Sequence, residues 1–219
     1  MALIASRKRS TLASSFVLAP ERYDPRRALD PGRAETVPLG EIARTIRRVV
    51  QPSDRGGPWL VLDTSDAREG IIISRKLPTT DIGSAKKMVQ PGDVIISRLR
   101  PYLRQVAYVD DQIRNLGDRG LVCSTEFFVL RSSEGQSIAF LVPFLLSQQV
   151  QEVFAASQEG GHHTRFDEPT LLALPVPKSL VSRRETASEA VLESVKEYRT
   201  SEARIQSLVQ QSEKALSRR

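Results

Sequence analysis

The 219-residue sequence has little of what would define several other classes of protein. It has one cysteine, Cys123, which excludes an internal disulfide and a cysteine-rich zinc site and favours a reducing cytoplasm as its location. No stretch of about 18 uncharged apolar residues is present. Its N-terminal positive charges follow a very short apolar start, the reverse of a secretory signal. We therefore expect a protein that is neither exported nor inserted in a membrane.

The sequence also lacks the patterns of common catalytic sites. Residues 91–93 (PGD) are followed by no Glu-x-Lys at the distance typical of metal nucleases, and no Gly-rich loop follows a strand as in methyl-donor or nucleotide sites. The adjacent His162 and His163 have only Cys123 and scattered carboxylates to complete a metal site. We expect no catalytic activity, no metal and no cofactor; a small nuclease with an unrecognised site is the more distant alternative.

Positive charge is in excess. Lys and Arg number 32 against 26 Asp and Glu, which gives a formal net charge of +6 and favours polyanionic partners such as nucleic acid. Residues 1–35 are rich in arginine and interrupted by Pro20, Pro25 and Pro31, so this segment is either a basic arm that contacts phosphates or a solvated tail.

The hydrophobic patterns predict an α+β fold with a mixed or antiparallel sheet. Short strands at irregular spacing argue against a βαβ repeat. The expected elements are an amphipathic helix at 37–50, strands at 59–63, 71–74 and 94–97, a hairpin partner at 105–109, a single strand at 121–130, and a helix or helix pair at 138–156 broken near Pro143.

The C-terminal segment predicts one long helix. From about Arg183 onward there is no Pro or Gly, and an apolar seam follows heptad spacing. A helix of about 35 residues would be roughly 50 Å long, more than the domain needs for its own core, so it requires a partner. The predicted dimerisation residues of the seam are Val191, Val195, Tyr198, Ile205, Val209 and Leu216.

The order of several segments resembles one target recognition domain of the specificity subunits of type I restriction-modification enzymes. The most specific of them are residues 90–98 (QPGDVIISR) and 174–177 (LPVP). The others are residues 39–43 (LGEIA), 59–63 (WLVLD), 70–73 (GIII), 127–130 (FFVL), 140–148 (FLVPFLLSQ) and 160–166 (GGHHTRF). Family members usually have two such domains, so the chain is similar to a half-sized specificity subunit.

This resemblance implies a division of the chain and a set of partners. Residues 1–35 would be a basic N-terminal arm, 36–178 a DNA target recognition domain and 179–219 a C-terminal coiled-coil dimerisation helix. The implied partners are double-stranded DNA, a DNA adenine methyltransferase subunit that binds the methyl donor, a motor-nuclease subunit and a second copy of the chain. Residues 182–186 (SRRET) depart from the Gln-containing start that is common in the family at this helix.

Three groups of side chains are the candidate DNA contacts. Reading a duplex needs cations for phosphates and forked donors for base edges. One group lies at the end of a strand, a second is a set of phosphate contacts, and the third is a loop after a glycine pair. The first group is Arg98, Arg100, Tyr102, Arg104 and Gln105. The second is Arg75, Lys76, Lys86 and Lys87, and the third is His162, His163, Thr164 and Arg165.

Each group also has an ordinary structural interpretation. The first is then an exposed basic hairpin with Tyr102 in a minor core, and the lysines of the second are solvated. The third is then a glycine-stabilised turn in which Arg165 pairs with Asp167 or Glu168. The function that the sequence predicts is sequence-specific DNA binding that directs a methyltransferase or restriction complex to its site. The alternative is a coiled-coil adaptor of a defence complex, whose sheet domain binds protein.

Overall fold

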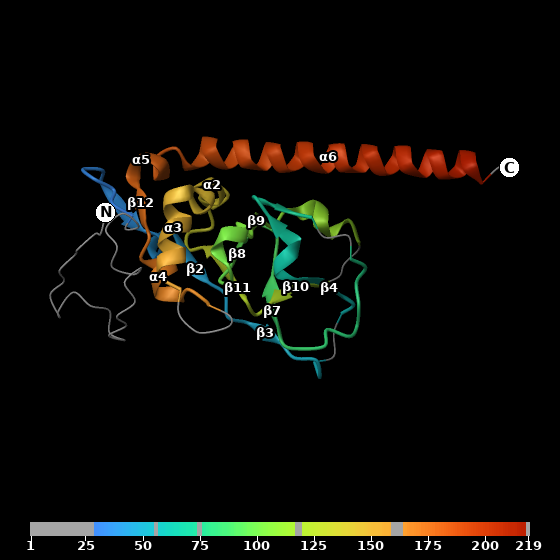
Figure 1. The fold of residues 1–219 in the computed structure, drawn as a ribbon, viewed down its shortest axis with the longest axis horizontal. Coiled ribbons are helices and arrows are strands. Elements are labelled where there is room, and N and C mark those ends of the chain that lie inside the picture. Colours follow the sequence, from blue (N-terminus) through green and yellow to red (C-terminus); the bar gives the residue numbers. More distant parts are fainter. Residues whose placement is uncertain (1–28, 55–56, 74–75, 117–119, 159–163, 218–219) are drawn as a thin grey trace, which may run out of the picture.

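Two four-stranded sheets form the centre of the fold (Figure 1). The computed structural model describes residues 29–54, 57–73, 76–116, 120–158 and 164–217. The first sheet is antiparallel, with the strand order β2 (Ala43–Thr45), β11 (Phe127–Ser132), β8 (Val94–Ser97), β9 (Val106–Tyr108). The second is mixed, because β10 and β4 run parallel; its order is β3 (Val49–Val50), β7 (Lys86–Val89), β10 (Gly120–Ser124), β4 (Trp59–Leu62).

Short elements and helices surround these sheets. Two small antiparallel pairs join β1 (Thr36–Pro38) to β12 (Pro175–Pro177) and β5 (Ala67–Arg68) to β6 (Ile71–Ile72). The 3₁₀ turns are η4 (Thr64–Asp66), η5 (Pro101–Leu103) and η6 (Asp111–Leu116). The helices are α1 (Leu39–Ile42), α2 (Leu141–Leu146), α3 (Gln148–Ala156), α4 (Glu168–Leu172), α5 (Lys178–Val181) and α6 (Arg184–Leu216).

Strand β8 separates the two main hydrophobic clusters. All four of its residues are buried. Val94 and Ile96 belong to the larger cluster with the phenylalanines of the helical layer, whereas Ile95 belongs to the cluster between the sheets. Because side chains alternate along a strand, a continuous apolar run is what a strand covered on both faces requires. The sequence therefore identified β8 and its partner β9 correctly.

Three expected elements differ from the structure. The amphipathic helix at 37–50 is wrong: only Leu39–Ile42 is helical, and the chain then pairs as β2 and β3. The helical spacing was coincidental, because sheet pairing outweighs local pattern in so short a segment. The run 121–130 is two strands in different sheets, separated by a turn at residues 125 and 126. The break between helices α2 and α3 is at Ser147 and not near Pro143. Pro143 lies in the first turn of α2, where its missing N–H costs little.

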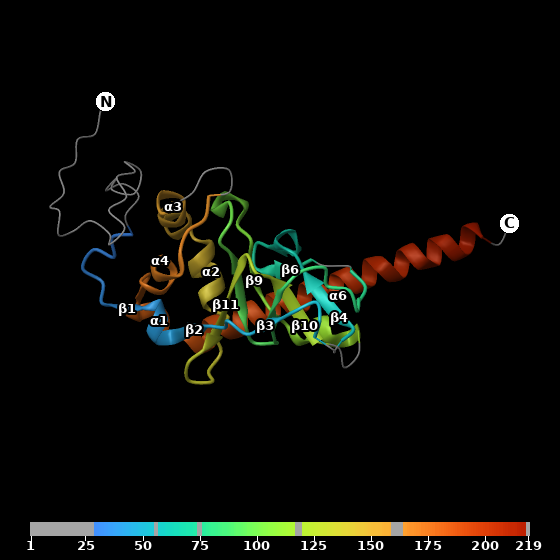
Figure 2. The same cartoon turned by 90° about the horizontal axis from the view of Figure 1, so that it is seen from below.

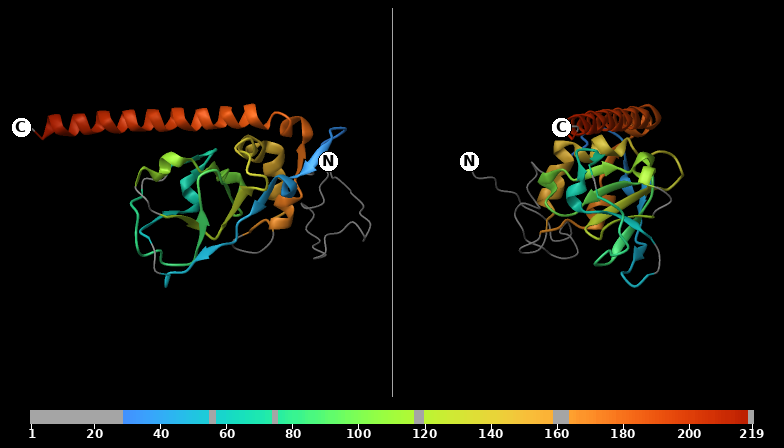
Figure 3. Two further views of the ribbon diagram at one scale, coloured as in Figure 1. Left: turned by 180° about the vertical axis from the view of Figure 1, so that it is seen from behind. Right: turned by 90° about the vertical axis from the view of Figure 1, so that its right-hand side faces the viewer.

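Helix α6 lies along one side of the domain and its C-terminal end extends beyond it (Figures 1 and 3). Its 33 residues make it about 50 Å long. The first half is docked: Val195 is 4% exposed, and the Ser188 hydroxyl, also buried, accepts a hydrogen bond from the Phe140 N–H. Of the seam residues, Val191 packs on the domain, whereas Ile205, Val209 and Leu216 are exposed. None of the described helices is long and apolar enough to cross a membrane.

Candidate nucleic-acid interface

The β8–β9 hairpin and the segment that follows α3 lie side by side. Leu99 and Arg165 form an isolated antiparallel bridge, and the Phe166 N–H donates to the Arg98 carbonyl oxygen at 3.3 Å. Figure 2 shows the green hairpin tip beside the C-terminal end of α3 at the upper edge of the view. Arg98 and Arg165, which belong to two of the three predicted groups of DNA contacts, are thus neighbours in space.

Glu126 joins these two segments through an ion-pair network. Arg98 Nε donates to Glu126 Oε2 at 2.8 Å, and Arg165 donates through Nε to Oε2 at 2.9 Å and through Nη2 to Oε1 at 2.8 Å. The hydrogen bond from Arg165, together with that from Arg98, outweighs burial and lowers the pKa of Glu126 to about 2. Arg165 therefore pairs with Glu126, an acid that the sequence did not suggest as its partner.

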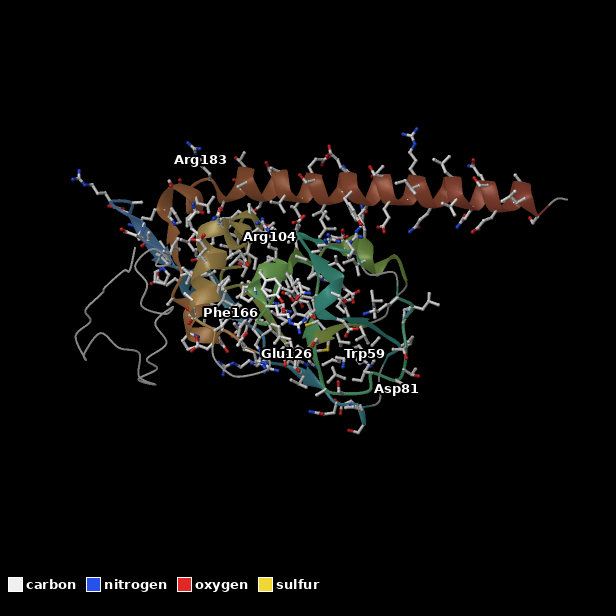
Figure 4. All side chains as sticks on the ribbon, viewed as in Figure 1. Trp59, Asp81, Arg104, Glu126, Phe166 and Arg183 are labelled. Atoms are coloured by element: carbon white, nitrogen blue, oxygen red, sulfur yellow. The ribbon has the colours of Figure 1, made fainter. Side chains whose placement is uncertain are left out.

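Phe166 anchors the second segment in the core. Its side chain is 1% exposed, and its ring stacks on Phe154 at a centroid distance of 4.1 Å and an interplanar angle of 15°. Figure 4 shows Phe166 within the helical part of the domain. An aromatic anchor next to Arg165 fixes the position from which that guanidinium extends. Phe166, the apolar residue that ends the loop, thus positions Arg165.

The hairpin tip presents side chains outward from a constrained backbone. Arg100 and Arg104 flank η5 with φ angles of 45° and 50°, in the left-handed region that non-glycine residues seldom adopt. Between them Tyr102 is 70% exposed and Leu103 is 43% exposed. Tyr102 is therefore not in a minor core. An exposed aromatic ring beside cations suits stacking on a base or packing in a groove.

Arg104 differs from its neighbours at the tip. Its Nε atom is buried and has no hydrogen-bond acceptor among the described residues; the nearest carboxylate oxygen, that of Glu69, is 3.9 Å away. In the view of Figure 4 Arg104 lies nearer to α6 than Glu126 does. Gln105 is half-buried, and its carbonyl oxygen accepts from the Ser97 N–H, which closes the hairpin. The tip is thus held by backbone bonds, and its exposed polar side chains are Arg100 and Tyr102.

The predicted phosphate-contacting lysines have protein partners. Lys76 Nζ lies 2.6 Å from both Asp63 and Asp66; burial opposes its charge, but these hydrogen bonds outweigh burial and raise the pKa of Lys76. Lys86 is 9% exposed and donates to the Ser84 hydroxyl. These two lysines are therefore less available to phosphates than an exposed arginine.

Lys87 is half-buried beside the Glu126 network. Its Nζ donates to the Phe127 carbonyl oxygen at 2.6 Å and lies 5.5 Å from the Phe128 ring centroid. Burial lowers the pKa of Lys87. The amine therefore adds positive potential behind the two segments without extending far into solvent.

The remaining predicted contacts are only partly described. Arg75, His162 and His163 lie outside the described residues. Thr164 is half-buried, and its hydroxyl donates to the Gln158 side-chain oxygen at 3.2 Å. In the described part of the chain no group of three or more His, Cys, Asp or Glu side chains could hold a metal ion. Burial raises the pKa of the Cys123 thiol to about 12, as expected of a thiol in a core.

Sequence reasoning missed two features of this surface. Glu126 lies in a turn inside what was expected to be a single strand, so no pattern marked it. Arg44, Arg47 and Arg48 lie in the segment that was expected to be an amphipathic helix, but they follow one another along an exposed extended segment that leads from the first sheet to the second. The signal available in the sequence was the presence of three arginines within five residues.

The fold and its surface define a class: an α+β domain with a mixed sheet, a basic hairpin and a long C-terminal helix. Solved structures with this fold include specificity subunits of type I restriction-modification systems, which confirms the resemblance found in the sequence. One is a chain from a study of complex assembly and conformational transition of the type I R-M system, with 28% identity and a TM-score of 0.54. Another is the HsdS subunit from Thermoanaerobacter tengcongensis, with 26% identity and a TM-score of 0.51.

The two matches have the same extent. Each covers 82% of this chain, but 47% and 46% of the respective neighbour. The chain therefore spans about half the length of these structural relatives. No family model matches the sequence, and neither does any curated protein.

Proposed function

We propose that this chain is a sequence-specific DNA-recognition subunit that directs a DNA methyltransferase or restriction complex to its target. The observation that carries this proposal is the structural match to type I specificity subunits over 82% of the chain. The exposed basic surface supports it, because duplex binding requires cations for phosphates together with forked donors for bases. The role proposed is recognition, with the chemistry performed by a separate enzyme.

The hairpin tip and the segment after α3 are the proposed reading surface. Arg100 and Tyr102 extend from the tip, and Arg165 extends from the neighbouring segment while held by Glu126. A guanidinium held by a carboxylate has a defined position, and its planar fork suits a guanine edge or a phosphate. Gln105, Thr164, His162, His163 and Arg75 remain proposed contacts, and Lys76, Lys86 and Lys87 are proposed to supply background potential.

The partners proposed are those of a type I system. They are duplex DNA, an adenine methyltransferase subunit that carries the methyl donor, a motor-nuclease subunit and a second copy of this chain. The exposed apolar residues Ile205, Val209 and Leu216 on the distal half of α6 are the proposed contact between copies, since an exposed apolar seam on a long helix is stabilised by a second helix.

Duplex binding at increasing salt tests the proposal. We expect the intact chain to bind a random-sequence duplex with a steep salt dependence, because Arg and Lys contacts release counterions from phosphates. Replacing Arg98, Arg100 and Arg104 by Ala should weaken binding far more than replacing Lys196, Arg204 and Lys214 on α6. Fluorescence anisotropy of a labelled duplex measures both.

A second variant separates recognition from folding. Arg98 also holds Glu126, so Arg100→Ala with Tyr102→Ala changes only exposed side chains of the tip and should weaken binding without changing the melting temperature. Equal losses from the hairpin and α6 variants would show that the interface lies elsewhere. Undetectable binding at low salt, even with the methyltransferase present, would favour the protein-adaptor alternative.

A further inference from the structure

A groove on the domain, separate from the hairpin, is lined by arginines. The chain passes from β2 in one sheet to β3 in the other, and two backbone hydrogen bonds fix the crossing. The Ile46 N–H donates to the Val129 carbonyl oxygen at 2.8 Å, and the Met88 N–H donates to the Arg48 carbonyl oxygen at 2.9 Å. Because both sheets hold this segment, the arginines on it extend from a defined backbone.

The groove is lined by aliphatic and basic side chains. Its volume is about 450 Å³, and Ile46, Val89 and Leu121 are the aliphatic residues that line it. The arginines that line it are Arg44, Arg47, Arg48 and Arg131. Among the described residues no acidic side chain belongs to this lining. A hollow of this composition attracts anions.

The arginines of the groove differ in how far they are neutralised. Arg131 binds buried Asp93 through two hydrogen bonds of 2.7 Å, and Arg47 donates to Glu168 at 2.8 Å. Both of these guanidinium groups therefore have a carboxylate partner.

Arg44 and Arg48 are exposed, and neither has a carboxylate partner among the described residues. Arg44 lies directly opposite Arg131 on the neighbouring strand; Asp93 compensates the charge of Arg131 but not that of Arg44. The groove is therefore a site of uncompensated positive charge, which a bound anion would stabilise.

We propose that this groove binds the phosphodiester backbone of duplex DNA as a second contact apart from the hairpin, an inference that rests on the proposed function. Arg44 and Arg48 are at most about 13 Å apart along the chain. Over that length one strand of a duplex presents roughly four phosphates along the axis. The described lining comes from strands and the segments between them, with no helix N-terminus to hold a terminal phosphate, so a continuous backbone fits better than a free nucleotide.

The salt dependence of binding tests the groove directly. The double variant Arg44→Gln with Arg48→Gln should lower the slope of log Kobs against log[salt] by about 1 to 2, since each phosphate contact contributes about 0.9. The loss should be equal on target and non-target duplexes, because backbone contacts carry no sequence information. Arg44→Lys with Arg48→Lys should retain the slope, as charge alone is required.

The control is Arg204→Gln with Lys214→Gln, which removes the same charge from exposed positions of α6. The groove inference would be overturned if the groove variant had the same salt slope as this control while the hairpin variant still bound DNA more weakly. That result would leave the proposed function intact. If the unaltered chain does not bind duplex DNA at all, both the groove inference and the proposed function fail. Because all four side chains are exposed, melting temperatures should not change.

Discussion

Glu126 joins two parts of the proposed reading surface that are far apart in sequence. Arg98 precedes it by 28 residues and Arg165 follows it by 39, yet both guanidinium groups bind its carboxylate. Flexible arginines lose conformational freedom when they bind a ligand. Arginines that are already ordered by Glu126 would lose less, so this carboxylate would act as a positioning residue for DNA binding.

Replacing Glu126 by Gln should lower the melting temperature at pH 7 and make it less dependent on acid pH. The pKa of the folded-state carboxyl is about 2 against an ordinary 4.5, so its stabilising effect is complete above about 4.5 and is lost as the pH falls toward 2. Thermal unfolding from pH 7 to pH 2 measures this change.

The control for this prediction is Glu134→Gln. Its carboxylate is 67% exposed and forms a 3.6 Å pair with Arg184. Such exposed pairs contribute little to stability. If Glu126→Gln and the control had the same melting temperature at every pH, Glu126 would not join the two segments.

At the scale of elements, the sequence predicted those whose signals are local. Strand β8 follows from a β-branched run introduced by a Pro-Gly turn, and Gly92 has the positive φ of 93° that the turn requires. Helix α6 follows from a long segment without Pro or Gly. The pairing of β2 and β3 with strands far along the chain left no local signal, so their segment was predicted as a helix. The Glu126 network was missed for the same reason.

Helix α6 has two halves with different surroundings, which its continuous heptad pattern does not reveal. Arg199 donates from Nη2 to Asp110 Oδ2 at 2.9 Å and to the Ile72 carbonyl oxygen at 2.8 Å, and both charged side chains are largely buried. Val195 is buried and Val191 packs on the core, so the proximal seam is occupied by the chain's own domain. A truncation after Val181 would remove these contacts, so one after Glu202 is better suited to isolating the recognition domain.

Replacing Arg199 by Leu should destabilise the protein by about 3 kcal/mol, because it leaves the Asp110 carboxylate buried without its partner. Urea unfolding measures the change. The matched control is Arg204→Leu, an exposed arginine on the distal half of the same helix, which should change stability by about 0.5 kcal/mol or less. Equal effects of the two substitutions would contradict the docking of the proximal half.

At the scale of the whole molecule, the chain corresponds to about half of its structural relatives. Two copies joined through the distal halves of α6 would restore a second recognition domain. A two-fold axis through such a pair would relate the two reading surfaces, and the DNA site would share that symmetry. The expected target is therefore an inverted repeat of two short half-sites with a fixed spacer between them.

Selection of binding sites from a random duplex library tests the central claim of sequence-specific recognition most directly. The intact chain, alone and with its methyltransferase, would be incubated with the library, and the bound DNA would be sequenced over successive rounds. We expect enrichment of an inverted repeat with a constant spacer. A single enriched half-site would retain the recognition function and reject the symmetric pair. A bound pool that stays as random as the starting library, in both conditions, would contradict the account.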